Sequence, residues 1–239
     1  MNDLASIVRS TVNSLTSTDI RRVHERLRDL ALQGHFVASL KQITFDRAAL
    51  RSIAKRSYLH YNDFDKIVLM SGKNDAAFEL RLHVWWANPD KVGCENVHDH
   101  KWDFSSVILD GGYDYEVFEV AESGQEMLEF CYATREGKRR YDAPFRGKKA
   151  LTCTARGMVS RGDAYSLRHD VLHRITSDRS RTTMTLVAQG RDVKETARVF
   201  TDSHTRLPKR IEAECFSSRE LKNRLDYVIQ TMDDARRIH

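Results

Sequence analysis

The chain has 239 residues and a formal net charge of +5, with 39 Lys and Arg interleaved among 34 Asp and Glu. No apolar run approaches the 18 residues of a transmembrane helix, so we do not expect a membrane partner. Because acidic and basic residues are mixed along the chain, we interpret the densest basic run, residues 138–140, as a solvated loop and do not expect a nucleic-acid partner. The four cysteines lack CxxC spacing and the amphipathic start lacks the apolar block of a secretory signal, which predicts free thiols in a cytoplasmic protein.

Residues 1–60 are predicted to form a helical extension. Residues 19–32 place apolar side chains close to one stripe, and Gly34 can end that helix. Another helical turn opens at Asp46. We expect this layer to pack on the outside of a β-rich region at residues 61–200.

From residue 66 the hydrophobic pattern changes to the period of two that is typical of strands. Residues 78–86 alternate in this way and predict a half-buried strand, whereas residues 135–149 read as a long polar loop. Short, closely spaced strands with almost no helix between them predict an antiparallel sandwich or barrel. The other predicted strands are 66–70, 102–109, 113–120, 127–134, 150–155, 164–167, 172–176 and 183–188.

Helix returns in the C-terminal segment, residues 201–239. Ser217 and Glu220 have the spacing of a capping box, and an apolar stripe follows them. The sequence therefore predicts a single domain, in which a β region is wrapped by terminal helices.

The most informative pattern is His98-Asp-His100, followed by Gly111 and answered much later by the turn at residues 162–163 and by His173. On a strand, side chains two residues apart lie on the same face, so both imidazoles of the pair face one way. A third imidazole from a distant strand completes a nitrogen-rich metal site. This pattern favours an enzyme.

These residues resemble the two conserved motifs of the cupin superfamily. Both histidines of the first motif and its closing Gly111 are in register, and residues 162–173 resemble the second motif, with His173 rather than His169 at the ligand position. The resemblance covers about residues 77–190. It implies a mainly β fold, a cupin-type antiparallel β-barrel (double-stranded β-helix) with N- and C-terminal helices, and a metal bound by His98, His100 and His173.

The sequence departs from the usual cupin motif at Phe104, which takes the place of a metal-binding glutamate. Three neutral imidazoles without a carboxylate resemble the arrangement around ferrous iron in the thiol dioxygenases, a cupin branch. The resemblance implies Fe(2+), with Ni(2+) or Mn(2+) as alternatives. Outside the three metal ligands the resemblance to thiol dioxygenases is weaker. Ser105 replaces the cross-linked cysteine of the mammalian-type members, and their Ser-His-Tyr relay has no counterpart here.

Three neighbouring residues stay open as ligands or supporting groups: Cys94, Asp103 and His169. Strand alternation aims the Asp103 side chain to the face opposite the histidines unless a bulge intervenes. The remaining histidines that lie in helical or loop contexts are interpreted as surface residues: His24, His35, His60, His204 and His239.

Two further residues are candidates for the catalytic machinery. Arg81 and His83 share a face of the strand before the first motif, and the planar guanidinium of Arg81 suits a substrate carboxylate unless that face is solvent. Tyr165, in a short strand before His173, is a candidate pocket residue, with core packing as the alternative.

The function predicted from these features is a mononuclear metal-dependent oxygenase. Its partners would be O2 and a small-molecule substrate, an amino acid or a cysteine-like thiol, and it would belong to a specialised biosynthetic pathway. The alternatives are a non-oxidative metal enzyme, such as an isomerase or lyase, and a non-enzymatic cupin that binds a small ligand. A homodimer is plausible, because an exposed face of such a β fold often pairs with a second subunit.

Overall fold

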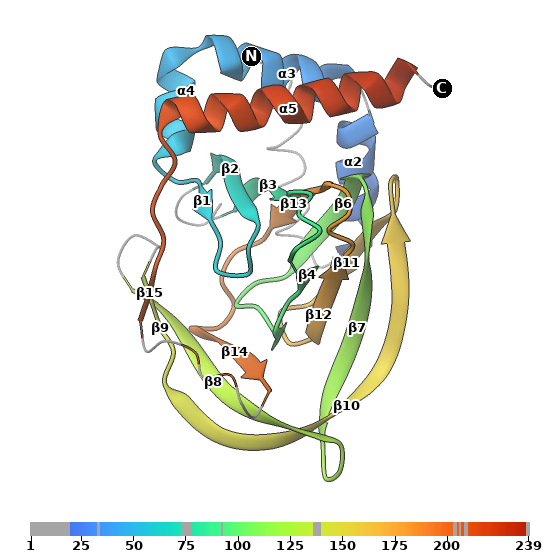
Figure 1. The fold of residues 1–239 in the computed structure, drawn as a ribbon, viewed down its shortest axis with the longest axis vertical. Helices are drawn as coiled ribbons and strands as arrows, with labels where there is room; N and C mark the ends of the chain where they lie inside the picture. Colours follow the sequence, from blue (N-terminus) through green and yellow to red (C-terminus); the bar gives the residue numbers. More distant parts are fainter. Residues whose placement is uncertain are drawn as a thin grey trace.

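A computed structural model describes residues 20–32, 34–72, 78–91, 93–135, 140–202, 205, 207 and 210–237. It places helices at one end of the molecule and two antiparallel sheets below them (Figure 1). The predicted mainly β fold with helices before and after the strands is therefore confirmed. Among the described residues, none of the helices combines the length and the apolarity needed to span a bilayer. The helices are α2 (Ile20–Leu32), α3 (Gly34–Phe45), α4 (Arg47–Ala54) and α5 (Ser218–Arg237).

The helix ends follow their local capping chemistry. The Asp46 carboxylate accepts hydrogen bonds from the backbone N–H groups of Ala48 and Ala49, at 2.8 and 3.0 Å, and so begins α4. Ser217 and Glu220 form the predicted reciprocal capping box of α5. The predicted end of the first helix before Gly34 is confirmed, because α2 ends at Leu32; Gly34 itself begins α3.

The first sheet lies under the helices, and its side chains supply one half of the main core. Its helix-facing residues, such as Leu82, Leu186 and Ile67, are fully buried against Leu225 and Phe36 from the helices. Because burying such side chains is worth about 1.5–3 kcal/mol each, this contact fixes the sheet on the helical layer. The strand order is β1 (Tyr58–Leu59), β2 (Asp65–Ser71), β3 (Glu79–Trp85), β13 (Thr183–Gln189), β6 (Phe104–Asp110) and β11 (Ala164–Leu167).

The second sheet lies beyond the other face of the first sheet and carries the long strands at the far end of the molecule (Figure 1). Strand β10 pairs with both β7 and β8, and β4 (Gly93–Cys94) pairs with β12. The strand order is β10 (Phe145–Ser160), β7 (Gly112–Ala121), β12 (Leu172–Ser177), β5 (Val97–His98), β14 (Thr196–Thr201), β8 (Gln125–Arg135), β9 (Arg140–Asp142) and β15 (Arg210–Glu212).

The interpretation of residues 135–149 as a long loop was wrong at its C-terminal side. Residues 140–142 form β9, and β10 begins at Phe145 and continues to Ser160. Its polar composition reflects an exposed surface, where Lys148 pairs with Glu126 across the strands at 2.7 Å. Pairing with two partner strands sets the conformation here, and the hydrophobic pattern does not reveal it.

Strand β3 is buried on both faces, where the sequence predicted a half-buried strand. Leu80, Leu82 and Val84 pack in the main core, while the alternate side chains from Glu79 to Trp85 face the second sheet. The alternation is real, but the polar face is turned inward because the second sheet covers it. A pocket lies between the two sheets on this face.

Candidate metal centre

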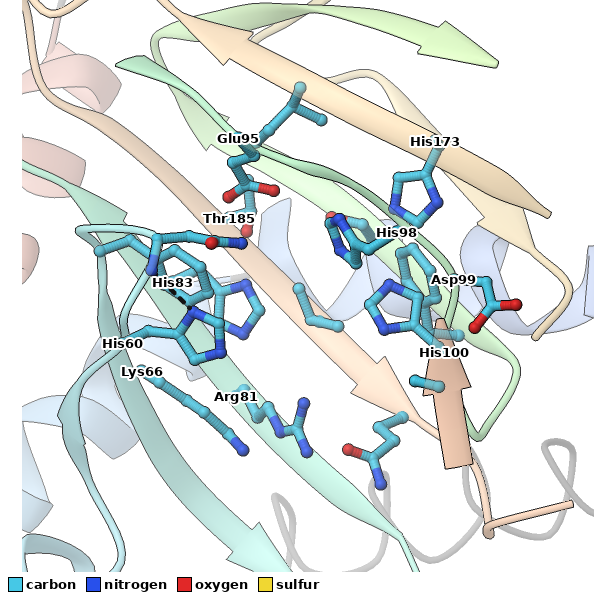
Figure 2. A pocket seen from close by; sticks show the side chains of 18 of the residues that line it. His60, Lys66, Arg81, His83, Glu95, His98, Asp99, His100, His173 and Thr185 are labelled. Carbon is cyan, nitrogen blue, oxygen red and sulfur yellow. Dashed lines mark hydrogen bonds between the residues drawn. The ribbon is translucent and has the colours of Figure 1, made fainter. Parts of the chain in front are cut away.

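Three histidines from distant parts of the chain converge in the pocket between the sheets. The ligand atoms of His98, His100 and His173 all lie within 4.8 Å of one another, and the His98 and His173 ring centroids are 4.7 Å apart. His98 and His173 are direct cross-strand neighbours on β5 and β12. His100 follows β5 in the loop that leads to β6. We call these three residues the histidine wall; Figure 2 shows their rings pointing toward a common space.

Backbone hydrogen bonds fix two of these rings. His98 Nδ1–H donates to the Asn96 carbonyl at 2.9 Å, and His173 Nδ1–H donates to the Val171 carbonyl at 3.1 Å. Since a carbonyl oxygen only accepts, each ring carries its proton on Nδ1 and keeps the Nε2 lone pair free. This is the tautomer and the orientation that metal-ligating histidines commonly have.

Burial keeps all three imidazoles in the neutral form that binds metals. It lowers the pKa of His173 to about 3, with His98 adding to the effect, and it lowers the pKa of His98 as well. The pKa of His100 falls well below its ordinary value, first through burial and then through the other two histidines. The donor set therefore fits a divalent metal without first losing protons.

Phe104 and Trp102 close the apolar side of the histidine wall. The His100 ring stacks on Trp102 with centroids 4.1 Å apart, and Phe104 meets His100 edge-on at 5.0 Å. Phe104 is 6% exposed, so a phenyl ring occupies space beside the rings where a carboxylate would add a fourth ligand. A metal held here would keep the full charge of the ion, since no protein anion joins the three donors.

The three residues left open as ligands do not join the cluster. Asp103 Oδ1 accepts hydrogen bonds from the backbone N–H and from the Nδ1 of His169, at 2.7 and 2.8 Å, which closes the turn before β12. Cys94 is exposed on β4. Within the described residues, the metal-ligand grouping consists of His98, His100 and His173 alone.

The wall facing the histidines carries buried charges. Glu79 Oε2 accepts from Arg81 Nε at 2.7 Å and lies 3.7 Å from Lys66 Nζ, and all three residues are buried. We call Lys66, Glu79 and Arg81 the charged wall. The Arg81 guanidinium also lies over the Trp102 ring, 5.0 Å from its centroid. Arg81 thus lies in the pocket, and two cations there share one carboxylate.

Tyr165 also lines the pocket, on β11 of the first sheet. Its hydroxyl forms a 2.6 Å hydrogen bond with the hydroxyl of Tyr113 on β7, so the pair bridges the two sheets. Burial raises the pKa of both phenols, which keeps both hydroxyls protonated at neutral pH.

Sequence reasoning missed several pocket residues. His60, interpreted as a surface residue, lines the pocket, and burial lowers its pKa well below the ordinary value. Glu95 lies on the same pocket and is 9% exposed; burial raises its pKa to about 8. Lys66, which also lines the pocket, was missed, and so was its ion-pair partner Glu79. Glu95 lies only three residues before His98, and this closeness to the histidine motif is the sequence feature that could have indicated it.

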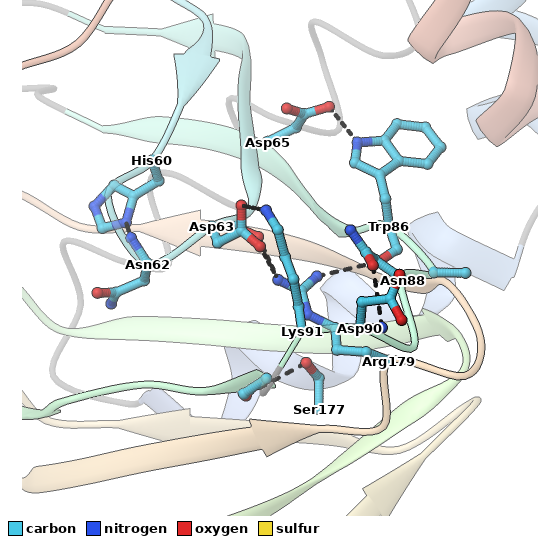
Figure 3. A network of polar contacts seen from close by, with 12 residues as sticks. His60, Asn62, Asp63, Asp65, Trp86, Asn88, Asp90, Lys91, Ser177 and Arg179 are labelled. Carbon is cyan, nitrogen blue, oxygen red and sulfur yellow. Dashed lines mark hydrogen bonds and ion pairs between the residues drawn. The ribbon is translucent and has the colours of Figure 1, made fainter.

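A polar network positions the loop that carries His60 (Figure 3). Arg179, which is 5% exposed, donates to the Asp63 carboxylate at 2.6 Å, to the Asp63 carbonyl at 2.7 Å and to the Trp86 carbonyl at 3.2 Å. Lys91 adds an ion pair to Asp63 at 2.8 Å. This network ties the loop to the end of β3 and to the β12–β13 turn, so His60 is held against the pocket by charges outside it.

The cavity enclosed by these walls measures about 170 Å³. Among the described residues, it is lined by buried polar atoms without a hydrogen-bond partner on His83, Thr185 and Gln189, and by the polar side chains of Trp85, Glu95 and Ser106. A buried polar atom without a partner costs about 1–3 kcal/mol, so a wall of such atoms suits a polar ligand.

No protein-family model and no curated protein matches the chain. Its structural neighbours include a protein described as a cupin superfamily member. The likeness concerns the fold alone, and the chain covers about half of the HppE chain. FeII HppE is 10% identical with a TM-score of 0.33, and the match covers 56% of this chain and 54% of that one. A cupin superfamily protein from Desulfitobacterium hafniense is 10% identical with a TM-score of 0.31, and the match covers 56% of this chain and 82% of that one. The DMSP lyase DddQ from Ruegeria pomeroyi is 14% identical with a TM-score of 0.36, and the match covers 62% of this chain and 56% of that one.

Proposed function

We propose that this protein is a cytoplasmic mononuclear metal-dependent oxygenase of the cupin type that acts on a small amino acid or thiol. The observation that carries the proposal is the convergence of three neutral imidazoles in a polar cavity between the sheets. Fe(2+) is the metal we favour, and Ni(2+) and Mn(2+) are the alternatives. When bound, such a metal supplies the electrons for O2 chemistry.

The residues of the chain have separate roles in this proposal. His98, His100 and His173 hold the metal, and the backbone carbonyls of Asn96 and Val171 keep the first and the last of these rings in place. Arg81 binds a carboxylate of the substrate through its planar guanidinium, which the stack on Trp102 orients. Tyr165 faces the same cavity and holds a proton on its hydroxyl, which the hydrogen bond to Tyr113 directs.

The charges of the site favour an anionic substrate. The three imidazoles are neutral and Phe104 adds no carboxylate, so a divalent metal keeps its two positive charges. The charged wall adds the ammonium of Lys66 and the guanidinium of Arg81, which both contact the carboxylate of Glu79. A thiolate or carboxylate offsets this excess at low dielectric, where electrostatic attraction is strong.

The test is elemental analysis of protein expressed with iron, nickel and manganese available, followed by oxygen uptake with a panel of thiols and amino acids. The proposal predicts about one metal ion per chain and oxygen consumption with at least one compound. A stoichiometric metal without oxygen consumption contradicts it. Product formation under strict anaerobiosis indicates instead a lyase or isomerase that uses the metal as a Lewis acid.

A further inference from the structure

Glu95 is a buried carboxyl group that neither the fold nor the metal site explains. It lies between β4 and β5, where its backbone N–H donates to the Ile175 carbonyl at 3.0 Å. The side chain points into the pocket (Figure 2), and among the described residues no partner meets its Oε1 with the geometry of a hydrogen bond. The Trp85 indole and the Arg179 guanidinium act on its charge, but no basic side chain in the described part of the chain forms an ion pair with it. Burying a carboxyl group in this way is costly, so its placement calls for a ligand.

The surroundings of Glu95 are aromatic. Phe64, Trp85 and Tyr113 form one buried cluster with Ile175, which lies beside the backbone of Glu95. The Trp85 ring centroid is 4.9 Å from that of Phe64 and 5.8 Å from that of Tyr113. Aromatic faces next to a carboxylate attract an ammonium group, because the ring quadrupole and the anion both favour a cation.

The carboxyl of Glu95 and the charged wall lie at different ends of the pocket. Along the pocket face of β3 the side chains run from Glu79 and Arg81 through His83 to Trp85, so the Arg81 and Trp85 positions are about 13 Å apart at the strand spacing. Figure 2 shows Glu95 and the Lys66–Arg81 pair on opposite sides of His83. Thr185, the cross-strand neighbour of His83, adds a buried hydroxyl without a partner.

We propose that Glu95 binds the protonated amine of the substrate, so that the pocket selects a molecule with a carboxylate at one end and an amine at the other. Arg81 and Lys66 take the carboxylate, Glu95 and the aromatic cluster take the ammonium group, and the histidine wall faces the space between them. This inference rests on the proposed function and narrows its substrate class to amino acids, excluding thiols that lack an amine. Burial raises the pKa of Glu95, and an ammonium group beside the carboxylate would favour its charged form.

The experiment compares pairs of ligands that differ only in the amine. 5-aminopentanoate is compared with pentanoate, and 6-aminohexanoate with hexanoate, by anaerobic calorimetry on the Fe(II)-loaded and on the metal-free protein. In at least one pair we expect the amine to increase the affinity at least tenfold. In Glu95→Gln, which keeps the shape but loses the charge, that ratio falls to about one. Glu126→Gln, an exposed glutamate on β8, is the matched control and keeps the wild-type ratio.

The inference is overturned if the amine adds no affinity in either pair, if Glu95→Gln keeps the wild-type ratio, or if none of the four ligands binds. These outcomes are distinct from failure of the proposed oxygenase, which is measured by metal content and oxygen uptake. An active oxygenase that binds hexanoate as tightly as 6-aminohexanoate would retain the proposed function and refute the role of Glu95.

Discussion

On the histidine wall, the rings of His98 and His173 are oriented by hydrogen bonds to backbone carbonyls, whereas on the charged wall Lys66 and Arg81 are held by one shared carboxylate, Glu79. The first arrangement belongs to the strands and is as rigid as they are. The second depends on a balance of buried charges, which a single substitution can upset. We therefore expect changes on the histidine wall to affect metal binding and changes on the charged wall to affect folding and ligand affinity.

Removal of a ring from the histidine wall should have the largest effect. His98→Ala removes one of three donors, and we expect the affinity for Fe(II) to fall by more than about 100-fold, beyond the 10–100-fold typical of supporting residues. Metal content after dialysis measures this. His169→Ala is the control, because His169 pairs with Asp103 in the turn, and it should retain the metal. Equal metal loss in both variants would indicate that His169 is a ligand and contradict the assignment of His98, His100 and His173 as the ligand set.

On the charged wall, Glu79→Gln removes the buried carboxylate that Lys66 and Arg81 both contact. Breaking a buried ion pair from one side costs about 3–5 kcal/mol, so we expect a loss of that size in the free energy of unfolding, measured by urea denaturation. The exposed pair Glu126–Lys148 provides the comparison, and Glu126→Gln should change stability by less than about 1 kcal/mol. If Glu79→Gln and Glu126→Gln lost the same stability relative to wild type, the ion pairs of Glu79 would contribute no more than an exposed pair, which contradicts this prediction.

These two walls also show how far the sequence predicts the site. The spacing of His98 and His100 is local and predicted that pair directly, whereas His173 was predicted from the resemblance of residues 162–173 to the second cupin motif. The charged wall was only partly visible, because Lys66 and Glu79 meet Arg81 through the register of β2 against β3. Alternation of polar and apolar residues along β3 reads as one solvent face, and it does not reveal that a second sheet covers that face.

The helices and most strands were predictable for a similar reason. The capping box of α5 and the strand periods are set by neighbours a few residues apart, whereas β9 and the start of β10 depend on partners from distant segments. Glu95 was missed because it lies outside any strand pattern, and because a single glutamate in a loop is usually exposed.

The pH dependence of stability tests whether Glu95 is truly an unpaired buried acid. Its pKa is raised from 4.5 to about 8 in the folded protein, so the unfolded chain loses its proton first as the pH rises. The resulting cost grows between pH 4.5 and pH 8, and it amounts to roughly 3 kcal/mol by pH 7. Glu95→Gln removes this cost. On metal-free protein we expect the variant to gain stability relative to wild type as the pH increases from 4.5 to 7. A constant difference across this range would mean that Glu95 has a counter-ion.

The smallest effect concerns the junction that sets the two walls opposite each other. Gly111 connects β6 of the first sheet to β7 of the second and has a φ of +73°. A Cβ atom there would lie 2.7 Å from the Thr182 carbonyl oxygen and 2.5 Å from Thr183 Oγ1, whose hydroxyl bonds the backbone of Gly112. We expect Gly111→Ala to cost about 2 kcal/mol in unfolding free energy, from the left-handed backbone and the clash together.

Gly162→Ala separates these two contributions. Gly162 also has a positive φ, of +89°, but a Cβ atom there would meet nothing within 4 Å. It should therefore cost only the backbone strain, about 1 kcal/mol, by thermal or urea unfolding. If the two variants lose the same stability, close packing at the β6–β7 junction does not hold the sheets in register, and the distance between the histidine wall and the charged wall must be set elsewhere.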